Sequence, residues 1–118
     1  MTKKQAERFL PLKPQWFHIL LALAGEEQHG YGIMQEIARQ SEGIYKLGPG
    51  TLYDNLQKLI QCGRVQELGP RRGDADPRRR YYRLTDAGRD VLRAETARLT
   101  QVVREARLRL GLPNPRRV

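Results

Sequence analysis

Apolar residues recur at intervals of three and four positions in three stretches of the first half of the chain. This spacing predicts one-sided helices at about residues 14–24, 30–39 and 49–62. Pro14 and Pro49 suit a first helical turn, and Gly43 suits the left-handed turn that follows a helix. The three apolar stripes are Trp16, Phe17, Leu20, Leu21 and Leu23; Tyr31, Met34, Ile37 and Ala38; and Leu52, Leu56, Leu59 and Ile60.

The spacing of the apolar residues changes in the second half of the chain. Residues 64–68 and 79–84 alternate polar and apolar side chains, which predicts two strands joined by a mobile, turn-rich loop at 69–78. A minor strand is also expected at 44–47. Helical spacing returns from about residue 86 to residue 110, after the N-cap Thr85, and gives a helix roughly 37 Å long that Gly111 ends.

The predicted order is helix, helix, short strand, helix, hairpin and long helix. Two short helices with a tight connection, followed by a basic hairpin, are typical of a winged helix-turn-helix. We therefore expect a mainly α-helical fold with a small β-hairpin, a winged helix-turn-helix extended by a long C-terminal helix.

Charge narrows the choice of partner. The 118 residues include 22 Lys and Arg against 13 Asp and Glu, a net charge of +9, which indicates nucleic acid or an anionic membrane surface. The longest apolar run, 16–24, is about half the length that spans a bilayer. The single cysteine, Cys62, excludes an internal disulfide and indicates a reducing compartment. One cytoplasmic domain is the expectation.

The third predicted helix has a polar side opposite its leucines. Steps of 100° place four polar residues, Gln61 among them, directly opposite the apolar stripe and three further residues on its flanks. Amide side chains suit adenine, and a carboxylate can accept from cytosine, so this side can read base edges. An ordinary solvated face is the alternative. The residues expected to face DNA are Thr51, Tyr53, Asp54, Asn55, Gln57 and Lys58.

The hairpin is the stronger sign of a nucleic-acid partner. Between residues 64 and 83 there are seven arginines and only three acidic residues. Arginine binds phosphate in a bidentate manner and fits a narrow minor groove, whereas a solvated, flexible loop is the alternative. Asp74 and Asp76 weaken the field at the tip, so the flanks are expected to touch DNA. The arginines concerned are Arg71, Arg72, Arg78, Arg79 and Arg80.

The last helix has an apolar stripe that extends too far for a small core to cover. A second chain would cover it, although packing on the first helix is the alternative, and a two-fold dimer would present two reading helices to a palindromic site. The dimerisation residues are Leu99, Val102, Val103, Ala106 and Leu110. The predicted parts are a flexible basic N-terminal arm at 1–13, a winged helix-turn-helix DNA-binding domain at 14–84, a C-terminal dimerisation helix at 85–110 and a basic tail at 111–118.

Catalysis is not indicated. His18 and His29 are not in local register with Cys62, which is expected to be a plain buried or half-buried thiol, with redox sensing as the alternative. Paired carboxylates, a phosphate-binding glycine loop and metal-ligand spacing are all missing, so no catalytic residue, metal or cofactor is predicted. Acidic residues spread along the last helix argue against a membrane partner.

Four segments in order resemble the PadR family of bacterial transcriptional regulators over about residues 16 to 110. The segments are Ile19-Leu-Leu-Ala-Leu-Ala24, His29-Gly-Tyr-Gly-Ile33, Pro49-Gly-Thr-Leu-Tyr53 with Leu56 and Leu59, and Arg80-Tyr-Tyr-Arg-Leu-Thr-Asp-Ala-Gly88. The resemblance implies a homodimeric repressor that binds an inverted repeat and is released by a ligand or stress signal. The residues alone leave activation, or a non-specific architectural DNA-binding role, open beside repression.

The resemblance also implies places for particular residues. Thr51 and Tyr53 would lie at the DNA face, Tyr31 near the DNA backbone, and Arg78 to Arg80 at the wing. Gly48 stands where a serine often caps the reading helix, and Arg64 replaces a commonly apolar residue. The last helix has no aromatic residue, which argues against an aromatic effector sandwich there. Trp16 could instead line a small-molecule effector cavity, with a core or dimer contact as the alternative.

Overall fold

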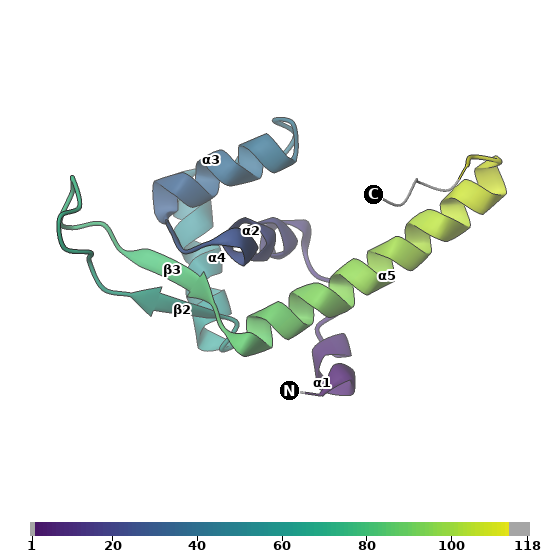
Figure 1. Ribbon diagram of the computed structural model, residues 1–118, viewed down its shortest axis with the longest axis horizontal. Helices are drawn as coiled ribbons and strands as arrows, with labels where there is room; N and C mark the ends of the chain where they lie inside the picture. Colours follow the sequence, from purple (N-terminus) through teal and green to yellow (C-terminus); the bar gives the residue numbers. More distant parts are fainter. Residues whose placement is uncertain (1, 114–118) are drawn as a thin grey trace.

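The computed structural model describes residues 2–113 and contains, within them, five helices and three short strands (Figure 1). The basic tail predicted at 111–118 lies outside the described residues from residue 114 onward. The elements in order are α1 (Lys3–Glu7), α2 (Pro14–Gly25), β1 (Gln28–His29), α3 (Gly30–Gln40), α4 (Pro49–Gln61), β2 (Val65–Leu68), β3 (Tyr81–Leu84) and α5 (Asp86–Leu110).

The predicted helices start and stop where the local chemistry expects them to. Pro14 and Pro49 occupy the first turns of α2 and α4. The Thr85 hydroxyl caps α5 by accepting from the Gly88 N–H at 3.0 Å, and Gly111 ends that helix at a positive φ of 68°. Gly43 likewise takes a φ of 81° after α3.

The core forms around α2, which packs against α3, α4, α5 and β3. Apolar side chains from seven elements and from the segment before α2 are buried together. Each fully buried leucine or isoleucine contributes about 1.5–3 kcal/mol relative to exposure. The members of the core include Ile19, Leu20, Leu23, Ile33, Ile37, Leu52, Leu56, Leu59, Tyr82, Val91 and Leu92. The fold class expected from the sequence is confirmed.

The sheet has β3 between β1 and β2, and both pairings are antiparallel. Val65 pairs with Leu84 and Leu68 with Tyr81, so the hairpin is the predicted one, and its loop reaches away from the body (Figure 1). The strand predicted at 44–47 is wrong. The Ser41 hydroxyl holds that segment as a turn by accepting from the Tyr45 N–H at 2.9 Å. The third strand is instead β1, too short to show any alternation.

The sequence predicts a flexible arm at 1–13. The N-terminal segment instead contains a helix, α1, that packs on α5. A capping box starts it, in which Thr2 and Gln5 each accept from the backbone N–H of the other, at 3.2 and 2.8 Å. Ala6 and Leu12 are buried. The capping box and these two apolar residues were the signals available in the sequence.

Glu95 is a buried carboxylate in α5, with only 2% of its side chain exposed. It accepts from the Leu12 N–H at 2.7 Å and forms an ion pair with Arg98. Burial raises the pKa of this carboxyl, but the hydrogen bonds from Arg98 and Leu12 and the charge of Arg98 outweigh burial and hold the pKa below its ordinary value. Glu95 therefore ties the segment before α2 to the long helix.

The backbone at the start of α5 approaches β2 so closely that position 88 requires glycine. A Cβ at Gly88 would lie 2.0 Å from the carbonyl oxygen of Arg64, which is a backbone atom and cannot move aside. That oxygen accepts from the Thr85 N–H at 3.2 Å. The first turn of α5 is thereby held directly against the start of β2.

We expect Glu95→Gln to lower the free energy of unfolding by about 1–3 kcal/mol at neutral pH, the usual cost of weakening a buried charge-assisted hydrogen bond. The amide has no charge to offer Arg98, so the tie between α5 and the segment before α2 weakens. Urea unfolding followed by circular dichroism measures the difference.

Glu105→Gln is the matched control, because Glu105 pairs with Arg109 in the same helix but is half exposed, and such pairs contribute about 0–1 kcal/mol. Since the pKa of Glu95 is lowered on folding, its contribution is complete above the unfolded-state pKa and is lost as pH falls through the folded-state pKa. The difference between wild type and Glu95→Gln should shrink on acidification. A difference no larger than that of Glu105→Gln would contradict this role.

Candidate nucleic-acid interface

The outer side of α4 is polar and exposed because its leucines face the core. Leu52, Leu56 and Leu59 are buried, and the side chains of Thr51, Tyr53, Asp54, Gln57 and Lys58 face outward. Asp54 and Lys58 form an ion pair at 3.2 Å, four residues apart on the exposed surface. The pair cancels its own charge, so Gln57 stands on a nearly neutral surface.

Asn55 does not share this surface, in contrast to the sequence-based expectation. Only 7% of the residue is exposed. Its Oδ1 accepts from the indole N–H of Trp16 at 3.0 Å, and its Nδ2 donates to the Thr51 carbonyl at 2.8 Å. A flank position at 100° steps does not distinguish a surface amide from a buried one. Asn55 thus joins α4 to α2 rather than facing outward.

Trp16 is half-buried and packs against the core. Its indole N–H donates to Asn55, and the Lys13 ammonium lies 5.9 Å from the ring centroid. These contacts explain the residue as a link between α2 and α4. A role in an effector cavity stays a prediction.

Two of the predicted wing arginines are engaged within the protein. The Arg71 guanidinium lies 4.0 Å from the ring centroid of Tyr81 and forms an ion pair with Glu27, from the turn before β1. Arg79 lies 3.6 Å from Asp74, which also accepts from the Tyr81 hydroxyl at 2.6 Å. The hydrogen bond from Tyr81 and the charge of Arg79 hold the pKa of Asp74 below its ordinary value.

The other three arginines reach further into solvent. Arg78 is 90% exposed and lies 3.4 Å from Asp76, and Arg80 lies 3.4 Å from Glu67 across the hairpin. Arg72 is exposed at the loop. Ion pairs at these distances on an open surface are weak, so their arginines can exchange a carboxylate for another anion.

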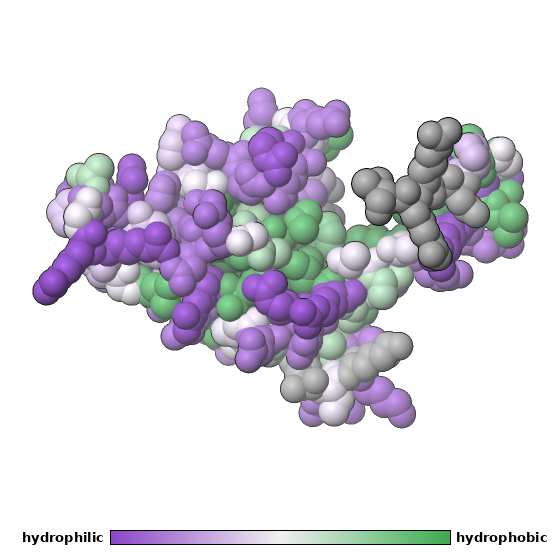
Figure 2. Space-filling view, in the orientation of Figure 1, coloured by the Kyte–Doolittle hydropathy of each residue, from purple (hydrophilic) through white to green (hydrophobic). Residues whose placement is uncertain are grey.

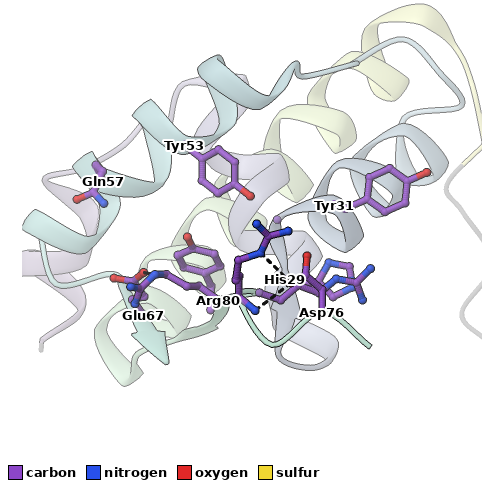
Figure 3. A pocket seen from close by; sticks show the side chains of 11 residues that line it. His29, Tyr31, Tyr53, Gln57, Glu67, Asp76 and Arg80 are labelled. Atoms are coloured by element: carbon purple, nitrogen blue, oxygen red, sulfur yellow. Dashed lines mark hydrogen bonds and ion pairs between the residues drawn. The ribbon is translucent and has the colours of Figure 1, made fainter. Parts of the chain in front are cut away.

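A cleft of about 480 Å³ lies between α4, the start of α3 and the wing (Figure 3). Tyr53 and Gln57 stand on its α4 side, Glu67 and Arg80 on its strand side, and Tyr31 comes from α3. The lining groups are His29, Gly30, Tyr31, Tyr53, Gln57, Glu67, Asp76, Arg78, Arg79, Arg80 and Tyr82. Hydroxyl and guanidinium groups of this kind donate to phosphate oxygens, and an amide donates to and accepts from base edges.

Gly30 is the residue that lets Tyr53 lie in this cleft. A Cβ at position 30 would stand 2.3 Å from the Tyr53 hydroxyl oxygen. The His29 side chain caps α3 immediately beside it, accepting from the Gly32 N–H at 3.1 Å. The segment His29-Gly-Tyr-Gly-Ile33 and the segment around Tyr53 are therefore parts of one site.

The predicted dimerisation residues lie on the part of α5 that leaves the body (Figure 1). Val102 and Val103 are about half exposed, Leu110 is exposed, Ala106 is exposed and Leu99 is half-buried. Apolar side chains gather in the angle between the body and α5 and again at the far end of that helix (Figure 2). Leu108 and Leu112 are also exposed there, although the sequence stripe did not include them.

Cys62 is exposed, so the expectation of a buried or half-buried thiol was wrong. The residue is the C-cap of α4, so it lies beyond the last turn of the helix that packs on the core. Among residues 2–113, no cluster of three or more His, Cys, Asp or Glu could hold a metal ion. Over the same residues, no helix combines the length and apolar character needed to cross a bilayer.

Known proteins resemble this chain in both sequence and structure. The sequence model of the transcriptional regulator PadR-like family matches residues 19–94. The transcriptional regulator Rv3488 of Mycobacterium tuberculosis is 36% identical over 88 residues, which are 75% of this chain and 78% of that protein. A 37.1 kDa protein in transposon TN4556 of Streptomyces fradiae is 38% identical over 77 residues, 65% of this chain and 20% of that protein.

Solved structures share the fold. A PadR family transcription regulator from Clostridium difficile has a TM-score of 0.68 at 19% identity, over 83% of this chain and 98% of that one. Bacillus subtilis PadR, solved in complex with operator DNA, has a TM-score of 0.61 at 22% identity, over 92% of this chain and 52% of that one.

The structural likeness establishes the winged helix-turn-helix with its long C-terminal helix. Membership rests on the sequence matches. The family model covers α3, α4 and the wing. The chain belongs to the PadR-like family of transcriptional regulators, a family of DNA-binding proteins and not of enzymes.

Proposed function

We propose that this regulator is a homodimeric, sequence-specific repressor that binds an inverted-repeat operator. The observation that carries the proposal is the cleft of about 480 Å³ between the outer side of α4 and the arginine-rich wing. One wall of the cleft offers Gln57 on a nearly neutral helix, and the other offers guanidinium groups. That division matches the two tasks of an operator-binding protein, reading bases and holding phosphates.

In this proposal α4 enters the major groove. Gln57 reads base edges there, Thr51 and Tyr53 lie beside it, and the Asp54–Lys58 pair at 3.2 Å flanks it on the exposed side. Asn55 plays no part in the reading, because its amide is used by Trp16 and Thr51.

Phosphate contacts come from the wing and from α3. Arg72, Arg78 and Arg80 are the exposed cations of the wing, and Tyr31 is exposed at the start of α3. Each phosphate that an arginine neutralises releases counterions, so affinity should fall steeply with salt. Bacillus subtilis PadR has been solved with operator DNA, which supports double-stranded DNA as the partner of this chain as well.

The dimer forms through the outer half of α5. A stripe of Leu99, Val102, Val103, Ala106 and Leu110 continues along one side of a helix that leaves the body. Pairing two such helices about a two-fold axis places two α4 helices on one side of the assembly. Their half-sites should be spaced by one helical turn of DNA, roughly 34–36 Å, or by a multiple of it. An effector molecule would act by changing that spacing.

Operator binding should be selective for DNA sequence. The purified protein should bind a site selected from random DNA, or an inverted repeat beside its own gene, at least about a thousandfold tighter than unrelated DNA. Fluorescence anisotropy at a fixed salt concentration measures both affinities, and transcription in vitro from the same site should fall when protein is added. Equal affinity for all sequences would instead support an architectural DNA-binding protein.

Single substitutions should separate base reading from phosphate contact. Gln57→Ala should reduce discrimination between the selected site and single-base variants by about 1–3 kcal/mol, because the amide no longer matches a base edge. Arg78→Ala should weaken all sequences alike and reduce the slope of log affinity against log salt by about 1. Titrations with matched and variant duplexes over a salt series test both.

Gln101→Ala and Arg93→Ala are the matched controls, since both residues are exposed on α5, away from the cleft. They should leave selectivity and the salt slope unchanged. If Arg78→Ala behaved like Arg93→Ala, the wing would not be the phosphate-binding element.

Charged substitutions on the α5 stripe should disrupt the proposed dimer. Val102→Asp combined with Val103→Asp should yield monomers, because it places charges on the stripe that the partner helix would cover. Analytical ultracentrifugation or light scattering measures the mass. Thr100→Asp combined with Gln101→Asp adds the same charge at neighbouring exposed polar positions and should leave dimers intact. A dimer that survived the valine changes would rule out this interface.

A further inference from the structure

The wing contains a carboxylate where charge alone would not place one. Asp74 lies in the loop 69–80, among arginines that we propose to hold DNA, and a negative charge there repels phosphate. Yet its side chain is only 6% exposed. A residue added merely to balance charge at the surface would stay in solvent, so the burial of Asp74 calls for another explanation.

Asp74 gathers the loop around itself. Its Oδ2 accepts from the Tyr81 hydroxyl at 2.6 Å, and its Oδ1 lies 3.6 Å from the Arg79 guanidinium and 3.4 Å from the Asp76 backbone nitrogen. These contacts join Asp74, at the loop tip, to the segment 76–79 that leads back to the sheet and to Tyr81, the first residue of β3. Two of the three arginines proposed to contact phosphate, Arg78 and Arg80, lie between these attachment points in the sequence.

Tyr81 continues the network to the body of the protein. Tyr81 is buried, and the Arg71 guanidinium lies 4.0 Å from the centroid of its ring. The rings of His29 and Tyr81 form a T-shaped pair with their centroids 5.5 Å apart. Arg71 in turn pairs with Glu27, which belongs to the turn between α2 and β1. The loop is thus connected through aromatic and charged contacts to the helix-turn-helix.

A loop of this length without helix or strand would otherwise have to be ordered when DNA binds. Each flexible side chain that is immobilised on binding reduces affinity, and ordering it beforehand removes that cost. The network orders the loop in the absence of DNA. The same network reduces the positive charge available to DNA, because Arg71 and Arg79 form ion pairs within the protein.

We propose that Asp74 is a positioning residue for DNA binding: through Tyr81 and Arg79 it holds the wing loop so that Arg78 and Arg80 face the DNA. The inference rests on the proposed operator binding. Charge alone predicts that an acidic residue in the wing weakens binding to a polyanion. In this proposal Asp74 strengthens that binding.

The matched pair Asp74→Asn and Asp76→Asn tests this directly. Both remove one negative charge from the same loop, but Asp76 is far more exposed and its Oδ1 acceptor for the Arg78 N–H, at 2.9 Å, is kept by asparagine. Asp76→Asn should leave affinity for the selected operator unchanged or raise it. Asp74→Asn should lower affinity about tenfold, the scale of immobilising one or two flexible side chains on binding.

Tyr81→Phe gives an independent measurement without a change of charge. It removes only the hydroxyl that donates to Asp74 and keeps the ring beneath Arg71. It should lower affinity in the same direction, and Asp74→Asn combined with Tyr81→Phe should be no worse than the stronger single variant, because both remove one interaction. Additive losses, or tighter binding by Asp74→Asn, would overturn the proposal.

Two readouts separate this proposal from the others. Trypsin, which cleaves after arginine, should cut the loop of Asp74→Asn faster than that of wild type without any DNA present, while urea unfolding of the whole protein stays unchanged. If wild type bound no selected site, the proposed operator binding would fail and only the trypsin result would bear on the loop. If wild type bound but loop cleavage and affinity were the same in Asp74→Asn, only the role of Asp74 would be lost.

Discussion

The rotation of α4 about its own axis is set by burial, and the functional surface depends on that rotation. Leu52, Leu56 and Leu59 are almost completely buried on one side of the helix. Together they represent roughly 5–9 kcal/mol of apolar burial before opposing terms are counted, so turning the helix by a single 100° step would be prohibitive. The hydrogen bond of 3.0 Å from Trp16 to Asn55 adds a polar constraint in the same direction. With one side of α4 fixed in the core, Gln57 has to face outward.

Charge in this protein is divided between holding the structure together and meeting the partner. The excess of nine positive charges first indicates only a polyanion. In the folded chain Arg98 forms an ion pair with the buried carboxylate of Glu95. Arg71 and Arg79 form ion pairs that hold the wing loop. Arg72, Arg78 and Arg80 remain oriented toward solvent. The number of arginines in the hairpin therefore overstates the number of phosphate contacts that the wing can make.

Much of the fold could be read from the sequence because long, one-sided apolar stripes have one stable arrangement. α2, α3, α4 and α5 appear within a residue or two of their expected bounds, and so does the hairpin. The errors involve features that periodicity does not carry. β1 is two residues long, and its pairing partner is more than fifty positions away. α1 is a single short helix that is stabilised by packing on α5, a contact that no local pattern announces.

The site was predictable to a similar extent and for similar reasons. Steps of 100° find the exposed side of α4 but misplace Asn55, because a flank position becomes core or surface according to the neighbouring helix. Glu95 resembles a solvated helix residue until the Leu12 backbone nitrogen is found 2.7 Å from it. The ion pair of Arg71 with Glu27 joins residues 44 positions apart. Such long-range partners are a property of the folded chain.

The long helix also has a mechanical consequence. α5 is held to the body from the close approach at Gly88 as far as Glu95, and the fifteen residues from Thr96 to Leu110 continue beyond that anchor. At 1.5 Å per residue this free part is a lever of about 22 Å. A tilt of about 10° at the anchor therefore displaces its tip by about 4 Å, which is comparable with the rise of about 3.4 Å between neighbouring base pairs. In the proposed dimer, a small change where the N-terminal segment meets α5 would be large enough, at the other end of the lever, to shift the partner subunit by a whole step along DNA.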